Sequence, residues 1–263
     1  MTIKTFCGKI DYMKLNFKIN KYYLLVHSLG QRDLPFPEWK NLQNKLWKKY
    51  PDSYLLLSRM PELAFIKTNS SKELSRICSG IEKIISIASS SREFTRLLKE
   101  TKKYLEFVKN QWNKNRDIVL TTIEELSGLK ISNKTIEVLI THPKLRNGIN
   151  FPQFNAIGWG HIEDWENYTT VYLAHELTHI LTSNKYKDEN IIHALIEMMT
   201  DNELRIRLNR NGKYFKEGKF EIGHTFLRNL EKQILPYWRQ YLKTKNKNIF
   251  KFEKKLIGIL PKK

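Results

Sequence analysis

The spacing of apolar positions divides the chain into a helical first half and a mixed second half. Through most of residues 38 to about 130, apolar residues recur every three to four positions, which is the period of an amphipathic helix. Ser71 and Ser91, each followed two residues later by a glutamate, mark helix starts, and Gly128 marks a helix stop. The sequence therefore predicts a succession of helices that ends near Lys130.

The segment before these helices has two interpretations. Residues 12–20 alternate weakly between apolar and polar side chains, which is typical of a strand. The alternative is that this segment precedes a helix over residues 21–30, for which Asn20 would be the N-cap.

After Gly128 the pattern changes to short runs rich in β-branched and apolar residues. Residues 135–140 (TIEVLI) and 155–160 (NAIGWG) are the clearest of these runs, and Pro143, Gly148 and Pro152 lie between them. Two or three short strands in this segment would form a small sheet.

Helical periodicity then returns and continues to the end of the chain. Apolar spacing predicts helices over residues 164–183, 188–208 and 225–242, with a kink at Pro236. In the lysine-rich tail from Leu242 to Lys263, apolar residues keep helical spacing, so a terminal amphipathic helix that packs on the body is favoured over a free basic arm. The expected fold class is α+β and mostly helical, with a helical N-terminal region at 1–130 and a second region at 131–263.

Composition bears on the possible partners and on the cellular compartment. The 263 residues carry a formal charge of +19, which suggests nucleic acid or an anionic surface as a partner, but the lysines are spread along the whole chain rather than gathered. Cys7 and Cys78 are too few and too far apart for a disulfide framework, which fits a reducing compartment. With neither a signal-peptide pattern nor an apolar run long enough to span a membrane, the expected location is cytoplasmic.

One motif carries chemistry. Residues 175–179 read HELTH within an apolar, uncharged helix, so His175 and His179 lie one turn apart on the same face. On a helix, His-Glu-x-x-His binds zinc through its two imidazoles, and the glutamate, here Glu176, acts as a general base on a water molecule. The longer metzincin pattern is excluded because Thr182 and Lys185 replace its glycine and third histidine.

A zinc site of this kind needs a third protein ligand. Glu197 lies in an apolar stretch of the next predicted helix, where a carboxylate is costly unless it is paired or coordinated. Glu189 and Glu203 are alternatives, but Glu189 is close to the helix start and Glu203 is off the face that Asp201 shares with Glu197. His193, four residues before Glu197, also lies on that face. A carboxylate such as Asp201 can accept the free ring N–H of a ligand histidine.

HELTH followed by Glu197 and Asp201 resembles the gluzincin group of zinc metallopeptidases, which includes thermolysin and the M1 aminopeptidases. The resemblance covers about residues 135 to 209, although the ligand spacing is slightly shorter and the aminopeptidase Gly-x-Met-Glu-Asn motif is absent. It implies a zincin-like core of a small sheet with an edge strand, a HELTH helix and a glutamate helix, with helical parts at both ends. It also implies Zn²⁺ on His175, His179 and Glu197, with Asp201 supporting a histidine.

The same resemblance implies how substrate would bind. An edge strand pairs with the backbone of an extended peptide, and residues 155–161 are similar to the thermolysin strand that carries an Asn-Ala pair, here Asn155 and Ala156. A donor for the oxygen of the transition state comes from downstream in the family, and His224, Tyr214 and Tyr186 remain open candidates.

The sequence thus predicts a zinc metallopeptidase with a peptide or protein substrate, of broad range or dedicated to one protein. The alternative is a catalytically silent zinc-containing or basic helical module that recognises nucleic acid or an acidic partner. Glu176 favours the enzyme, because a general base is useful only for chemistry.

Overall fold

The computed structural model describes residues 13–30, 37–49, 51 and 82–261. The helix start predicted at Ser71 and both cysteines lie outside these residues. Within them the chain is α+β and mostly helical, as predicted. Among the described helices, none combines the length and the apolar character that a membrane crossing requires.

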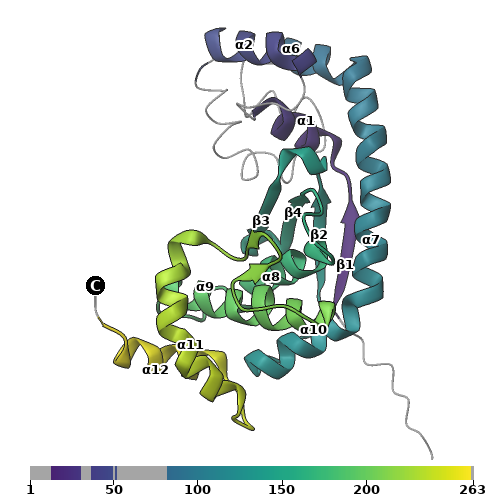
Figure 1. The fold of residues 1–263 in the computed structure, drawn as a ribbon. Helices are drawn as coiled ribbons and strands as arrows, with labels where there is room; N and C mark the ends of the chain where they lie inside the picture. Colours follow the sequence, from purple (N-terminus) through teal and green to yellow (C-terminus); the bar gives the residue numbers. More distant parts are fainter. Residues whose placement is uncertain (1–12, 31–36, 50, 52–81, 262–263) are drawn as a thin grey trace, which may run out of the picture.

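A four-stranded mixed sheet lies at the centre of the molecule (Figure 1). Its order is β1 (Lys14–Lys18), β2 (Thr135–Ile140), β4 (Ala156–Gly160) and β3 (Asn147–Phe151). β1 and β4 run parallel to β2, whereas β3 pairs antiparallel with β4. Residues 12–20 therefore supply both predicted features: β1 is a strand, and the Asn20 side chain accepts hydrogen bonds from the backbone at the start of α1 (Lys21–Gly30).

One prediction about the sheet is wrong. Residues 155–161 do not form an edge strand, because β4 is hydrogen-bonded to a neighbour on each side, and the edges of the described sheet are β1 and β3. Across the predicted boundary at residue 130, β1 and the long helix α7 (Arg92–Ser127) share a core with β2.

Helix α7 runs along most of the molecule and links its parts (Figure 1). Its ends follow the predicted signals: the Ser91 hydroxyl accepts from the Phe94 N–H at 3.0 Å, and Gly128, with φ of 71°, donates its N–H to Glu124. The middle and end of α7, together with α8 (Tyr168–Thr182), cover one face of the sheet. Residues buried in this layer include Val108, Trp112, Ile123, Ile136, Val138, Leu173 and Leu177.

Two further helical groups flank the sheet. The cap consists of α1, the short turn η1 (Pro37–Trp39), α2 (Lys40–Lys49), α6 (Glu82–Ser89) and the first turns of α7, around an apolar cluster of its own. At the other end, α9 (Glu189–Glu197) packs with α11 (Arg228–Leu242) and α12 (Ile249–Ile259). The tail prediction is confirmed, because Ile249, Phe252 and Leu256 of α12 are buried against this group. α11 continues through Pro236.

The helix predicted over 188–208 is one helical rod in three parts. Between α9 and α10 (Arg205–Asn209), residues Met198–Leu204 form a π-helical turn, η4. Two short turns, η2 (Pro143–Leu145) and η3 (Pro152–Phe154), flank β3, and a small hairpin of β5 (Lys216–Glu217) and β6 (Phe220–Glu221) leads through η5 (Thr225–Leu227) into α11.

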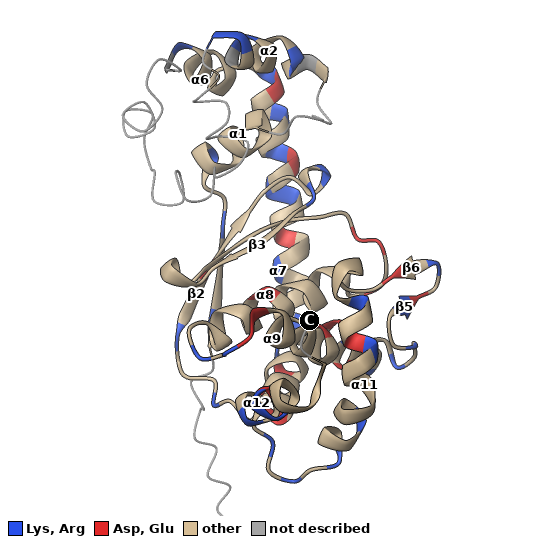
Figure 2. Ribbon diagram, turned by 90° about the vertical axis from the view of Figure 1, so that its left-hand side faces the viewer, with Lys and Arg blue, Asp and Glu red and all other residues tan. Residues whose placement is uncertain are grey.

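Lys and Arg lie along α2, α7, α11, α12 and several loops, rather than on one face of one element (Figure 2). This distribution agrees with the interpretation of the positive charge as a property of the whole surface.

Candidate metal and active site

α8 holds its two histidines at the wall of a cleft. Its other face is apolar and packs on the sheet, which fixes the helix in rotation. His175 is buried and His179 half-buried, and their Nε2 atoms lie only 3.1 Å apart. Two imidazoles four residues apart thus converge on one point beside α8.

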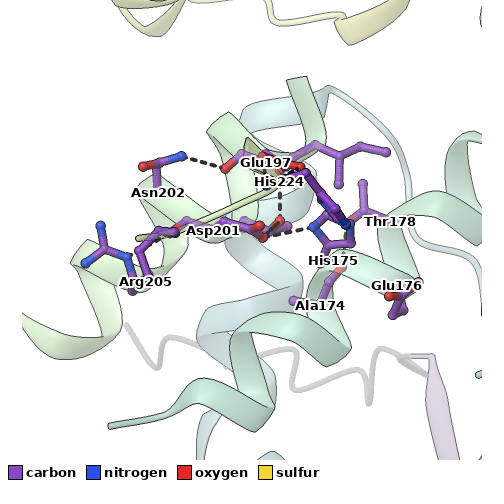
Figure 3. A network of polar contacts seen from close by, with 12 residues as sticks. Ala174, His175, Glu176, Thr178, Glu197, Asp201, Asn202, Arg205 and His224 are labelled. Atoms are coloured by element: carbon purple, nitrogen blue, oxygen red, sulfur yellow. Dashed lines mark hydrogen bonds and ion pairs between the residues drawn. The ribbon is translucent and has the colours of Figure 1, made fainter. Parts of the chain in front are cut away.

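Asp201 orients His175. Its Oδ1 lies 2.9 Å from Nδ1 of His175 (Figure 3). The Thr200 hydroxyl donates to the same oxygen at 2.8 Å. Burial lowers the pKa of the His175 imidazole, but the Asp201 carboxylate outweighs burial and raises that pKa to about 9. With Nδ1 engaged by Asp201, Nε2 is directed toward His179, the arrangement expected of a supported metal ligand.

Glu197 lies opposite, at the end of α9, and is fully buried. Its carboxylate accepts the backbone N–H of His224 at 3.0 and 3.1 Å, and Nδ1 of His224 lies 2.5 Å from Oε1. The π-turn follows directly, and Asn202 within it donates to the Glu197 carbonyl at 3.0 Å. π-helical turns are rare and concentrate at functional sites. The π-turn between Glu197 and Arg205 therefore identifies this part of the rod as a candidate functional segment.

His193 is a further imidazole in the cleft. Its Nε2 lies 3.5 Å from Oε1 of Glu197, and its ring centroid lies 4.6 Å from that of His179. Burial and the nearby imidazoles lower the pKa of His179 to about 2 and that of His193 to about 3. Both rings are therefore neutral, which is the form that binds metals.

Glu176 faces the cleft from α8, beside the edge strand. Asn150 of β3 donates to its Oε2 at 2.6 Å, and burial raises the pKa of the Glu176 carboxyl. Its oxygens are thus held beside a strand whose outer edge has no partner among the described residues.

The cleft contains a cavity of about 290 Å³ that joins these groups. Its lining combines the histidines and Glu176 with the edge strand and the turn before α9. The lining residues are Gly148, Ile149, Asn150, Pro152, His175, Glu176, His179, Ser183, Tyr186, Glu189, His193 and His224.

The segment that carries His224 is anchored to the rod by Arg205. This buried guanidinium donates to the carbonyls of Asp201 (2.8 Å) and Lys213 (2.6 Å) and pairs with Glu217 of β5. Gly223, with φ of 80°, then brings the backbone against the Glu197 carboxylate so closely that a Cβ there would overlap it.

A second buried carboxylate, Glu231, lies near Glu197. Arg228 donates to its Oε2 at 2.7 Å and also to the Ile222 carbonyl. Burial and then the charge of Glu197 raise the pKa of Glu231 to about 8. Arg228 thus holds the other side of the segment that ends at His224.

Two pairs of donor atoms in the cleft have the spacing of zinc ligands. Zinc–ligand bonds of 2.0–2.1 Å at tetrahedral angles place neighbouring donor atoms about 3.3–3.4 Å apart. The observed separations, 3.1 Å for His175 to His179 and 3.5 Å for His193 to Glu197, lie on either side of this value. The group whose donor atoms all lie within 4.8 Å of one another consists of His175, His193 and His224, and it includes neither His179 nor Glu197.

Of the predicted residues, His175, Glu176 and His179 line the cavity. Glu197 and Asp201 are buried behind it, where Asp201 contacts His175 and Glu197 contacts His224. Asn155 and Ala156 do not support the predicted pairing with substrate, since Asn155 is in an exposed turn and Ala156 is buried in the central strand β4. A strand can add a peptide only along a free edge, and among the described strands that edge by the cavity belongs to β3.

The positions of the alternative third ligands and of the candidate transition-state donors differ in the structure. Glu203 is hydrogen-bonded to Tyr214, whose oxygen also accepts from Trp238, and neither residue lines the cavity. Glu189, Tyr186 and His224 all line the cavity, and His224 also contacts Glu197.

Asn150 and Arg205 were not predicted, and local spacing holds no signal for them. Asn150 reaches Glu176 only through strand order, and Arg205 reaches the β5–β6 hairpin only through tertiary packing. No protein-family model, no curated protein and no solved structure matches this chain.

Proposed function

We propose that the protein is a zinc-dependent metallopeptidase with a gluzincin-like core. The observation that carries the proposal is the convergence of His175 and His179 at 3.1 Å, with Asp201 on the back of His175, in the cavity that also holds Glu176. Zinc would be held by His175, His179 and Glu197, and when bound it would activate water and polarise the scissile carbonyl.

The chain's own groups then have distinct roles. Glu176 accepts a proton from the attacking water and passes it to the leaving amine. Asn150 positions Glu176 through its hydrogen bond to Oε2. Of the three candidates for the transition-state donor, Tyr186 and His224 line the cavity and Tyr214 does not. His224 is favoured because its Nδ1 faces Glu197, which leaves Nε2 for the substrate oxygen.

Substrate binding follows from the edge strand. An extended peptide would pair its backbone with β3, whose residues 148–150 line the cavity. Such pairing recognises backbone rather than side chains, so it suits a peptide or protein substrate.

The first experiment is metal analysis of the purified chain after dialysis against a weak chelator. We expect one zinc per chain in the wild type and little in His179→Ala or Glu197→Ala. His142→Ala is the matched control, because His142 is also buried but bonds to Glu100 on α7. Absence of zinc from a folded wild type supplied with the metal would contradict the proposal.

The second experiment separates metal binding from hydrolysis. Glu176→Gln keeps the shape of the side chain but removes the base, so it should retain zinc and lose cleavage of a peptide library. Equal cleavage by Glu176→Gln and the wild type would exclude Glu176 as the base.

A further inference from the structure

The rod and α8 each carry a pair of donor residues one helical turn apart. His175 and His179 form the pair on α8, and His193 and Glu197 form the pair on α9. The two pairs face each other, since the His193 ring centroid lies 4.6 Å from that of His179 and 5.4 Å from that of His175. The cleft thus contains a box of four donor groups.

His193 Nε2 is the exceptional atom in this box. It is buried, and no hydrogen-bond partner for it exists among the described residues. Its separation of 3.5 Å from Glu197 Oε1 is too long for a normal hydrogen bond. Buried polar atoms are rarely left without a partner, because the loss of hydration is uncompensated. An atom of this kind, directed into a group of metal-binding side chains, indicates a missing ligand.

The other extra imidazole has a different environment. His224 bonds to Glu197 through both its backbone N–H and its ring Nδ1, at 3.0 and 2.5 Å, and its side chain is 47% exposed. Those contacts orient the Glu197 carboxylate. His193 makes no comparable contact and is mostly covered, so of the two it is the better placed to donate its lone pair to a metal.

We propose that His193 is a fourth protein ligand, which binds the same metal ion as His175, His179 and Glu197 through Nε2. This inference rests on the proposed metal site and extends it. The separations within the two pairs are 3.1 and 3.5 Å, which suit neighbouring zinc ligands, and donor nitrogens of His175 and His193 lie within 4.8 Å of each other, which links the pairs. Four protein ligands would hold zinc more tightly than three, and a reacting water would then be a fifth ligand, a number that zinc accepts.

The test counts imidazoles and measures retention on the full chain. Zinc-edge X-ray absorption of zinc-loaded wild type should show three histidine ligands, and His193→Ala and His193→Gln should each show two. Competition with a chromophoric chelator should show a lower affinity for zinc in both variants than in the wild type. His142→Ala should change neither quantity, and circular dichroism establishes that each variant is folded.

Each other result overturns the inference. Two histidines in the wild type would exclude His193 as a ligand, as would an unchanged count in the variants. Weaker retention with an unchanged count would give His193 a supporting contact instead. If these results came with zinc-dependent hydrolysis by the wild type, only this inference would fail. A wild type that binds no zinc would remove the proposed function as well.

Discussion

The cap and the cleft bury opposite kinds of side chain. The interior of the cap is a cluster of aliphatic and aromatic residues, with Leu24, Leu25 and Leu29 of α1 at its centre. The interior behind the cleft contains buried charges, among them Glu197, Asp201, Arg205 and Glu231. Apolar burial stabilises a fold directly, whereas buried charges are stable only through one another. The cap is thus stabilised mainly by apolar burial, whereas the interior behind the cleft depends on pairing between charged groups.

The sharpest way to test this contrast is to remove the proposed base. Glu176→Gln should lower hydrolysis about 10²- to 10⁴-fold, because proton transfer to the base is lost, while the melting temperature stays close to that of the wild type. Steady-state cleavage of a peptide substrate and a thermal melt measure the two quantities. Glu106→Gln, an exposed glutamate on α7, is the control and should leave both unchanged. A large fall in melting temperature for Glu176→Gln would place Glu176 among the structural residues.

Substitution of two arginines on α10, one buried and one partly exposed, compares the contributions of buried and exposed charges to stability. Arg205→Met should lower the free energy of unfolding by about 3–5 kcal/mol, because it leaves Glu217 and the carbonyls of Asp201 and Lys213 without their donor. Arg207→Met removes a partly exposed pair with Glu125 and should cost no more than about 1 kcal/mol. Urea denaturation measures both, and equal losses would contradict the role given to burial.

The cap provides the opposite case. Leu25→Ala should lower the free energy of unfolding by about 3 kcal/mol, through the lost transfer energy and the cavity that remains. Zinc affinity of the folded protein should not change, because Leu25 lies in the cap cluster and outside the cleft. Denaturation and chelator competition provide the two measurements. A loss of zinc affinity at temperatures where the variant is folded would show that the regions are coupled.

Asn150→Ala should have the smallest effect. Loss of the 2.6 Å hydrogen bond to Glu176 frees the carboxylate to turn, and we expect hydrolysis to fall about tenfold, which corresponds to about 1.4 kcal/mol. Stability should change little, since Asn150 is on an edge strand. Gln153→Ala, in the exposed turn after β3, is the matched control. If the rate were unchanged in Asn150→Ala, the strand would not position the base.

Local signals in the sequence predicted much of the fold. Ser91 and Gly128 marked the ends of α7 because caps act through adjacent backbone groups, and the apolar spacing of α12 predicted the face that packs. The same holds for His175 and His179, whose proximity follows from the helical repeat alone. Features that depend on residues close together in the sequence could therefore be predicted.

Features set by distant segments were not. Residues 147–151 contain Gly148 and precede Pro152, so they resemble a turn, yet they form the edge strand because β4 offers a partner. The sequence NAIGWG resembled an edge strand, but β4 lies inside the sheet. There Tyr23 approaches Gly158 and Thr141 approaches Gly160 so closely that a Cβ at either glycine would overlap them. The π-turn after Glu197 was likewise concealed, since a single extra residue barely alters an apolar repeat.

The pairing of β1 with β2 has a consequence for synthesis on the ribosome. Leu15 pairs with Ile136, so β1 emerges 121 residues before its partner exists. At about 5–20 residues per second, the strand waits roughly 6–24 s with its backbone unpaired. Its sequence is KLNFK, with a lysine at each end, and charged residues of this kind discourage pairing with other chains. The two lysines would thus protect the nascent chain from aggregation until the sheet can close.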